Sequence, residues 1–280
     1  LGLGALLFPP VQGAALLAWA SVALGLTFVA YSVVSLVHQG WGARLGGDAS
    51  QRAQVVAWRE GLGLAGVMVA SVLPTLGGLP ALWGVCAGAL VLGVWALAHA
   101  PRRFAADAGD SHAAGTHDGS TWLPWQRPAF RRLLGVYVLN GIASAIPATL
   151  VLFFVQDVLR APPASEGLYL GLYFLCAALG VPVWVRVIRA RGLVRAWRIG
   201  MLMAIVAFAG ANTLGAGDGL AFACVCALTG LALGADLACP GALLAGVIAR
   251  SGDQNRHEGV YFGWWNFATK LNLALSAGLA

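Results

Sequence analysis

Residues 14–37 read AALLAWASVALGLTFVAYSVVSLV and contain no charged side chain. A transmembrane helix needs about 20 predominantly apolar residues to cross the hydrocarbon core of a bilayer, so this stretch is long enough to span a membrane. A short apolar stretch, 1–8, precedes it. Seven more long apolar runs follow at 60–73, 80–98, 133–155, 167–185, 199–214, 220–249 and 260–280. The sequence therefore predicts an all-α polytopic membrane protein with eight spanning helices.

The composition excludes the common soluble classes of protein. Hydrophobic residues make up 59% of the chain and charged residues 10%, against about 25% charged residues in an average soluble domain. A soluble globule of this size could not hide so much apolar surface, because its outer layer must be polar. This excludes an ordinary cytosolic enzyme and a nucleic-acid-binding domain, although the net charge is +6.

Basic residues lie in alternate loops, which predicts the orientation of the chain. Short loops that stay on the cytoplasmic side of a membrane carry an excess of Lys and Arg. The loops around 9–13, 74–80, 156–166 and 215–219 hold Arg160 alone and are predicted to lie outside. The other loops are predicted to be cytoplasmic, which makes this a multi-pass protein of the inner (plasma) membrane. They hold the remaining arginines, Arg44, Arg52, Arg59, Arg102, Arg103, Arg127, Arg131, Arg132, Arg186, Arg189, Arg191, Arg195, Arg198, Arg250 and Arg256.

The longest cytoplasmic loop divides the chain. Residues 100–132 are rich in Ala, Gly, Asp, His and Ser and contain prolines at 101, 124 and 128, a composition typical of a connector. We expect it to link an N-terminal helical part at 1–99 to a C-terminal helical part at 133–280. Because the chain begins without a methionine and ends inside an apolar run, we expect it to be a fragment of a longer protein.

Two charged residues lie deep within predicted spans. Lys270 is the only lysine in the sequence and lies 12 residues past Glu258, which is about 18 Å along a helix. Asp236 lies 14 residues before Arg250, about 21 Å from the cytoplasmic end of its span. A charge at the bilayer centre costs about 2.5–3.5 kcal/mol on insertion scales, so such residues face a cavity or a partner. At these similar depths, a structural ion pair and a role in substrate or proton coupling both fit.

Polar and aromatic residues precede Lys270. Asn266 lies four residues before it and so shares its helix face, and Trp265 and Thr269 lie on or beside that face. An aromatic plane beside hydrogen-bonding groups suits a sugar ring, whose C–H face stacks while its hydroxyl groups bond. Arg59 begins another span, where it either lines a cavity or anchors the end of the helix.

Tyr261 and Trp264, in the same segment, are expected to form part of an aromatic belt at the membrane interface. The spans contain neither the clustered carboxylates of a metal-dependent enzyme nor a nucleophile beside its base. They also contain no ATP-binding motif. We therefore expect that the protein is not an enzyme and that it has no metal site, no cofactor and no nucleic-acid partner.

Three segments together resemble one family of transporters. Residues 258–274, EGVYFGWWNFATKLNLA, resemble the penultimate helix of the glycoside–pentoside–hexuronide:cation symporters, the melibiose-carrier-like group of the major facilitator superfamily. Residues 38–48, HQGWGARLGGD, with Arg52 and the stretch WREG at 58–61, resemble that family's loop between helices 4 and 5. Residues 234–236, GAD, resemble part of its helix 10.

The resemblance implies a major-facilitator fold of two six-helix halves, here incomplete, with 1–8 as the end of helix 3 and the spans as helices 4 to 11. It implies a secondary active transporter, a sugar or glycoside:cation symporter that works by alternating access. Lys270 matches the family's helix-11 lysine, and Arg59 matches the helix-5 arginine that lines the sugar cavity. The family's cation site includes an acid of helix 4, but 14–37 contains none. A proton, a sodium ion and no ion at all stay open.

The expected partners are a sugar or glycoside substrate and the lipid bilayer, with the protein itself a monomer. Relatives in distant branches of the family carry lipids. A carrier of lipids or other amphiphiles with the same fold is therefore the alternative function, and it predicts insensitivity to sugars.

Overall fold

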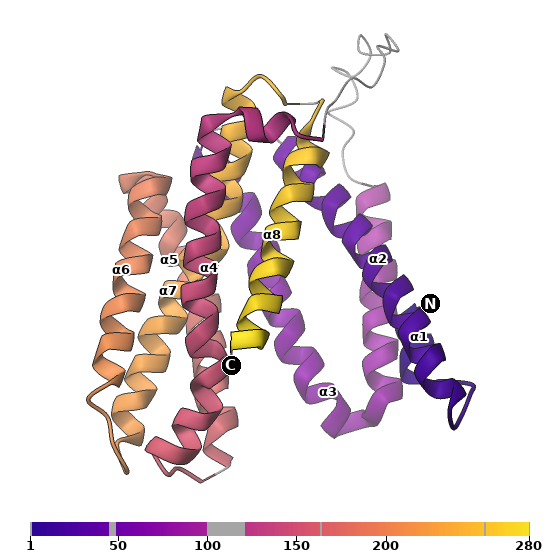
Figure 1. Ribbon diagram of the computed structural model, residues 1–280, viewed down its shortest axis with the longest axis vertical. Coiled ribbons are helices and arrows are strands. Elements are labelled where there is room, and N and C mark those ends of the chain that lie inside the picture. The colour runs from indigo at the N-terminus through magenta and orange to yellow at the C-terminus, as the bar shows by residue number, and fades with distance from the viewer. Residues whose placement is uncertain (1, 45–48, 100–120, 163, 255, 280) are drawn as a thin grey trace. The chain divides into compact units, whose positions relative to one another are not determined.

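A computed structural model of the protein describes residues 2–44, 49–99, 121–162, 164–254 and 256–279 (Figure 1). Every regular element in these ranges is a helix, which confirms the predicted all-α class. A short 3₁₀ helix, η1, covers Leu123–Gln126, and a single π-helical turn, η2, covers Phe154–Val158. The α-helices are α1 (Gly2–Leu7), α2 (Ala15–Arg44), α3 (Ala49–Ala98), α4 (Pro128–Phe153), α5 (Ala164–Arg191), α6 (Leu193–Ala211), α7 (Gly219–Arg250) and α8 (Glu258–Leu279).

In the described part of the chain, seven segments are long and apolar enough to cross a membrane. They correspond in order to the predicted runs from 14–37 to 220–249 and confirm a multi-pass membrane protein. The last predicted span, 260–280, forms α8 but is not among them, because Glu258, Asn266 and Lys270 lower its hydropathy. The seven segments are Ala15–Ala43, Ser50–Pro74, Leu76–Ala98, Pro128–Val151, Ser165–Arg191, Leu193–Ala211 and Gly219–Arg250.

One element, α3, contains two of the predicted spans. The sequence predicts a loop at 74–80 between them, but the helix instead turns back at Gly78 (Figure 1). Gly78 has φ 68° and ψ −171°, a conformation that a residue with a side chain rarely adopts. Pro74 and Pro80 flank this glycine, and each proline lacks the N–H that a regular helix needs at that position. The chain therefore reverses at one glycine between two prolines, without a separate loop.

The described helices divide into two compact units. The first unit lies within Leu1–His38 and Gly66–Asp118, so it contains α1, most of α2 and the second part of α3. In this unit, Trp19 donates a hydrogen bond from Nε1 to the carbonyl oxygen of Ala5 at 2.9 Å. The contact attaches the short α1 to the long α2.

The second unit lies within Gln39–Ala65 and Gly119–Ala280 and holds all six candidate site residues. The parts predicted at 1–99 and 133–280 stay a prediction. Of the predicted connector 100–132, residues 100–120 lie outside the described ranges. The rest of it contains η1 and the first residues of α4, because Pro124 and Pro128 each occupy the start of a helix, where a missing N–H costs nothing.

In the second unit, α5 and α6 pack along α7, whereas α8 packs mainly on α4. Small residues let α5 and α7 approach closely. A Cβ atom at Gly230 would overlap the carbonyl oxygen of Tyr173, and one at Gly234 would lie 3.0 Å from Cδ1 of Trp184. The Trp184 indole also donates to the carbonyl oxygen of Leu231 at 2.7 Å. These contacts hold α5 and α7 in a fixed register, and α7 carries Asp236.

Candidate functional site

Asp236 lies near the middle of α7, and two neighbouring helices donate hydrogen bonds to it. Asn140 of α4 donates from Nδ2 to Asp236 Oδ1 at 3.1 Å, and Trp197 of α6 donates from Nε1 to the same oxygen at 2.6 Å. The Trp197 side chain is buried in the core between α5, α6 and α7. The described residues supply no donor to the second oxygen, Oδ2. Asp236 is therefore a half-buried carboxylate whose neighbours fix one oxygen and leave the other open.

The ion pair that the sequence allowed between Asp236 and Lys270 is not formed among the described residues. Asp236 bonds instead to Asn140 and Trp197. The reason is the packing of the helices: α7 and α8 follow one another in sequence, but α8 lies mainly against α4. Lys270 is half-buried on α8, one helical turn beyond Asn266. Asp236 consequently lies in a cluster with Asn140 and Trp197.

Two aromatic rings stack where α4 meets α8. The ring centroids of Tyr137 and Trp265 lie 3.9 Å apart with an angle of 23° between the planes. The Tyr137 hydroxyl group also forms a 2.8 Å hydrogen bond with Oγ1 of Thr269. Trp265 is only 7% exposed, so Tyr137 covers much of the indole face that the sequence assigned to a sugar. The aromatic surface of this seam is therefore shared between Tyr137 and Trp265.

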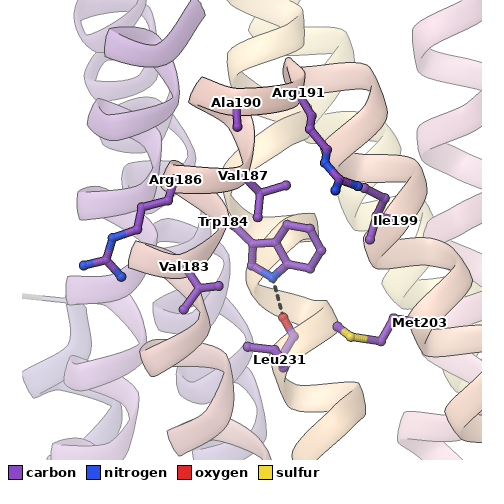
Figure 2. Close-up of a pocket in the computed structure, with 9 residues that line it drawn as sticks. All are labelled: Val183, Trp184, Arg186, Val187, Ala190, Arg191, Ile199, Met203 and Leu231. Atoms are coloured by element: carbon purple, nitrogen blue, oxygen red, sulfur yellow. Dashed lines mark hydrogen bonds between the residues drawn. The ribbon is translucent and has the colours of Figure 1, made fainter.

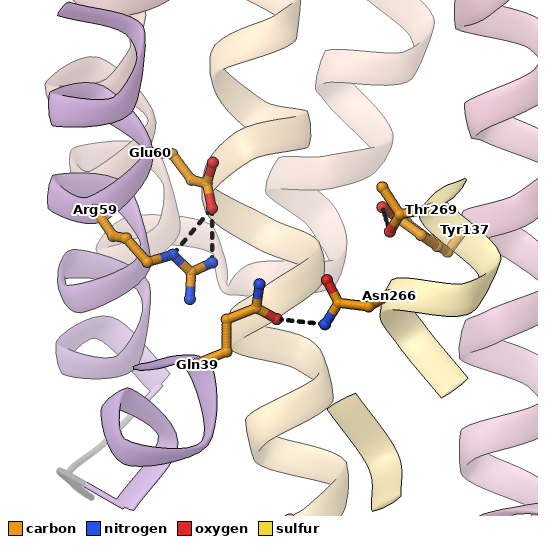
Figure 3. Close-up of polar contacts among 6 residues, drawn as sticks. All are labelled: Gln39, Arg59, Glu60, Tyr137, Asn266 and Thr269. Carbon is orange, nitrogen blue, oxygen red and sulfur yellow. Dashed lines mark hydrogen bonds and ion pairs between the residues drawn. The ribbon is translucent and has the colours of Figure 1, made fainter. Parts of the chain in front are cut away.

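A second polar contact joins α8 to the end of α2. Asn266 donates from Nδ2 to Oε1 of Gln39 at 3.1 Å and to the carbonyl oxygen of Phe262 at 2.8 Å. Figure 3 shows the two amide side chains pointing toward one another. Two neighbouring residues of α8 thus bond to side chains of other helices, Asn266 to Gln39 of α2 and Thr269 to Tyr137 of α4.

Arg59 forms an ion pair with its neighbour Glu60 on α3. The guanidinium group donates from Nε and Nη2 to Oε1 of Glu60 at 3.0 and 2.6 Å, and the two side chains are 27% and 33% exposed. A Cβ atom at Gly241 would lie 3.8 Å from Nη2 of Arg59. The arginine therefore extends toward α7 at a level just beyond Asp236, with its charge already balanced by Glu60.

Four residues of these clusters were not singled out from the sequence. Asn140 could have been found by the signal that marked Asp236, since it is a polar residue within an apolar run. Tyr137 lies in the same run, where a tyrosine does not stand out. Gln39 and Trp197 lie beside basic loops, where polar and aromatic residues are ordinary. Their roles depend on contacts with other helices, which no local pattern records.

A different kind of carboxylate cluster lies between α7 and α8. Arg127 donates to Asp253 from Nε at 3.2 Å and from Nη2 at 3.0 Å, and the hydroxyl group of Tyr261 donates to Asp253 at 2.6 Å. Burial alone would raise the pKa of Asp253, but these hydrogen bonds and the guanidinium charge outweigh it and lower that pKa below its ordinary value. The same hydrogen bonds raise the pKa of Arg127. Both groups are therefore charged at neutral pH.

The prediction that Tyr261 belongs to an interfacial aromatic belt is wrong. Its side chain is fully buried, and its hydroxyl group donates a hydrogen bond to Asp253. Trp264 is half-buried and donates from Nε1 to the carbonyl oxygen of Thr121 at 2.8 Å. Its ring centroid lies 5.2 Å from those of Trp122 and Trp125. Trp264 therefore belongs to an aromatic cluster that attaches the start of α8 to the segment before α4.

An apolar groove of 470 Å³ lies between α5 and α6 and contains none of the six candidate residues (Figure 2). Trp184 forms its wall, and Val183, Val187, Ile199 and Met203 line it. Arg191 reaches across toward Ile199, whereas Arg186 points away from Trp184. A sugar needs several hydrogen-bonding groups, and this groove does not offer them.

The comparison with family models agrees with the all-α membrane fold. A family model described as MFS/sugar transport protein matches residues 1–280, the whole chain. Neither the curated proteins nor the solved structures include a significant match. The family consists of transporters rather than enzymes, and its members carry small molecules across the lipid bilayer. The chain belongs to the MFS/sugar transport protein family and is a multi-pass secondary transporter of the major facilitator superfamily.

Proposed function

We propose that the protein is a sugar or glycoside:cation symporter of the melibiose-carrier-like type that works by alternating access as a monomer in the inner (plasma) membrane. The observation that carries the proposal is the seam between α4 and α8, where stacked aromatic rings and hydrogen-bonding side chains lie together within membrane-spanning helices.

The chemistry of the seam suits a sugar ring. Tyr137 supplies an aromatic face and Trp265 supports it from behind, so the C–H face of a sugar can stack there. Thr269 and Asn266 supply a hydroxyl and an amide group within one helical turn of each other. In this proposal these four residues bind substrate. The Asn266 amide group costs free energy in a membrane helix, which a substrate-binding role explains.

The charged residues have separate tasks in the proposal. Asp236 binds the coupling cation, because it is an acid in the middle of a span with one open oxygen. Lys270 lies one turn beyond Asn266 on α8 and contributes a charge at the end of the substrate seam. Arg59 shapes the cavity from α3, held in position by Glu60.

The alternative is a carrier of lipids or other amphiphiles, and one observation favours it. The groove between α5 and α6 is apolar and has Arg191 at one end, which matches an acyl chain with an anionic headgroup. The sugar proposal is preferred because the groove lacks the costly intramembrane polar groups that the α4–α8 seam contains.

Uptake by the protein in proteoliposomes tests the proposal. A panel of labelled sugars and glycosides is followed with an imposed proton gradient, with a sodium gradient and with neither. Gradient-dependent accumulation of at least one sugar is the expected result. Absence of sugar uptake under every gradient, with flipping of a labelled phospholipid, would favour the amphiphile carrier instead.

The variant Thr269→Val tests the substrate seam directly. It removes the hydroxyl group that bonds to Tyr137 and keeps the shape of the side chain. A lost hydrogen bond of about 0.5–1.5 kcal/mol raises the KM for the sugar by about 2- to 12-fold. The matched control is Thr229→Val on α7, whose hydroxyl group bonds to carbonyl oxygens of its own helix and should leave KM unchanged. Equal KM values for both variants would remove Thr269 from the site.

A further inference from the structure

We propose that the coupling ion is a proton rather than a metal cation, and that it binds at Oδ2 of Asp236. The inference rests on the proposed symport, because it names the ion for the site that the symport requires. In the covalent change, a hydronium ion loses one O–H bond and becomes water, its proton forms an O–H bond with Oδ2 of Asp236, and the charge of the side chain rises from −1 to zero.

The hydrogen-bond partners of Asp236 favour a proton over a metal cation. Both are N–H donors, from the Asn140 amide and from the Trp197 indole, and both point at Oδ1. Hard metal cations are held by sets of about six oxygen ligands. An amide N–H and an indole N–H offer hydrogen atoms at that oxygen, and indole has no acceptor at all. A metal cation at Oδ1 would have to displace two donors, whereas a proton on Oδ2 leaves both hydrogen bonds in place.

The backbone around Asp236 supplies few further oxygen ligands. Sodium sites in transporters commonly use carbonyl oxygens of an unwound helix segment, but α7 runs unbroken from Gly219 to Arg250. Pro240 has no N–H, so the carbonyl group of Asp236 loses its usual helical donor. That frees one oxygen, which points along the helix away from the side chain. In the described part of the chain, no group of three or more His, Cys, Asp or Glu residues is arranged to hold a metal ion.

The ionisable groups around Asp236 also favour a proton. Tyr137 of α4, Tyr173 of α5 and Cys239 of α7 lie within electrostatic range of the carboxylate. All three are neutral in their protonated forms. The neighbour from α6, Trp197, does not ionise, and α3 brings Arg59 already paired with Glu60.

The two side chains that donate hydrogen bonds to Asp236, Asn140 of α4 and Trp197 of α6, are both neutral. A carboxylate in this position carries an uncompensated charge in a membrane helix, and protonation removes that charge. Proton binding thus changes the electrostatic energy of the second unit, which is what a coupling site needs.

Infrared titration of the protein tests proton binding without reference to any substrate. The carbonyl stretch of a protonated carboxyl group is followed while the pH is varied. We expect a titrating band that disappears in Asp236→Asn and persists in Asp218→Asn, a control in the loop before α7 whose carboxylate accepts a hydrogen bond from the Gly215 backbone. Addition of sodium should leave the titration in place. A sodium-dependent shift, or a band that is unchanged in Asp236→Asn, would overturn the inference.

Measurements of sugar accumulation show separately whether the proton inference or the symport proposal is wrong. With one proton per sugar, a gradient of one pH unit gives accumulation of about tenfold. Wild-type protein should reach this value with a proton gradient, and Asp236→Asn should lose it while still exchanging labelled for unlabelled sugar at equilibrium. Accumulation driven by sodium alone overturns the proton and keeps the symport. Wild-type protein that accumulates no sugar overturns the symport, and the infrared result then decides the proton site by itself.

Discussion

Two aspartates of the second unit each accept hydrogen bonds from two side chains, and they differ in the charge of the donors. Asp253 binds the Arg127 guanidinium group and the Tyr261 hydroxyl group, outside the span of α7. Asp236 binds an amide and an indole within that span. The pair with arginine stabilises the ionised form of Asp253 over the whole physiological pH range. Neutral donors leave Asp236 able to change its protonation state.

The charge of the donors distinguishes a carboxylate that is held in its ionised form from one that can change its charge. A carboxylate that is always charged and always paired fixes two segments together, here the α7–α8 loop and the start of α4. A carboxylate with neutral partners contributes less to stability, but its charge can respond to an ion or a substrate.

The largest effect is expected for Asp236→Asn. The variant keeps an oxygen that can accept from Trp197 but loses the ionisable group, so gradient-driven accumulation should fall about tenfold, to the level without a gradient. Its melting temperature should equal or exceed that of the wild type, because an uncompensated charge has been removed. Uptake in proteoliposomes and thermal unfolding in detergent measure the two quantities. Full accumulation by this variant would place the coupling elsewhere.

A loss of similar size is expected for Lys270→Ala. We expect accumulation to be abolished while the protein still inserts into the membrane, because Lys270 is the one lysine and lies within a helix that also carries Asn266. Lys270→Arg keeps the positive charge and should retain part of the activity. Membrane extraction and size-exclusion chromatography confirm insertion of both variants. Normal accumulation by Lys270→Ala would rule out a coupling role for this residue.

For Asp253→Ala we expect a loss of stability without a change in transport. Removal of the carboxylate leaves the buried Tyr261 hydroxyl group without its acceptor, which costs about 1–3 kcal/mol of stability. The KM for substrate should stay unchanged, since Asp253 bonds to Arg127 and Tyr261 and not to the residues proposed to bind substrate. The control Tyr261→Phe removes the same hydrogen bond and keeps the contact between Arg127 and Asp253. It should destabilise less. A change of KM with unchanged stability would reverse the two roles.

The smallest effect is the pH dependence of stability. The pKa of Asp253 is lower in the folded protein than in the unfolded chain, where an aspartate titrates at about pH 3.9. The stabilisation is therefore fully present above about pH 4 and is lost as the pH falls through the lowered folded value. Thermal unfolding between pH 7 and pH 3 should show a steeper acid loss in the wild type than in Asp253→Ala. Parallel curves would mean that this carboxylate is not stabilised by folding.

Part of this arrangement is readable from local sequence. Asp236 and Lys270 stand out because a charge within an apolar run has few explanations, and the structure confirms that both lie within helices. Thr269 and Asn266 follow from helical spacing alone, and each does bond to another helix. Tyr137 and Trp197 were missed because an aromatic residue in or beside a span is ordinary, and its hydrogen-bond partner lies far away in sequence.

That the protein is helical and crosses a membrane several times follows from its amino-acid sequence. Those properties are local: a run of about 20 apolar residues must satisfy its own backbone hydrogen bonds in lipid, and only a helix does so within one segment. Which helix faces meet is known only from the packing: α8 lies against α4, and Asp236 bonds to Asn140 and Trp197 rather than to Lys270. Helices that are apolar on all sides do not encode their own rotation. Their orientation comes from close packing at residues such as Gly230 and Gly234.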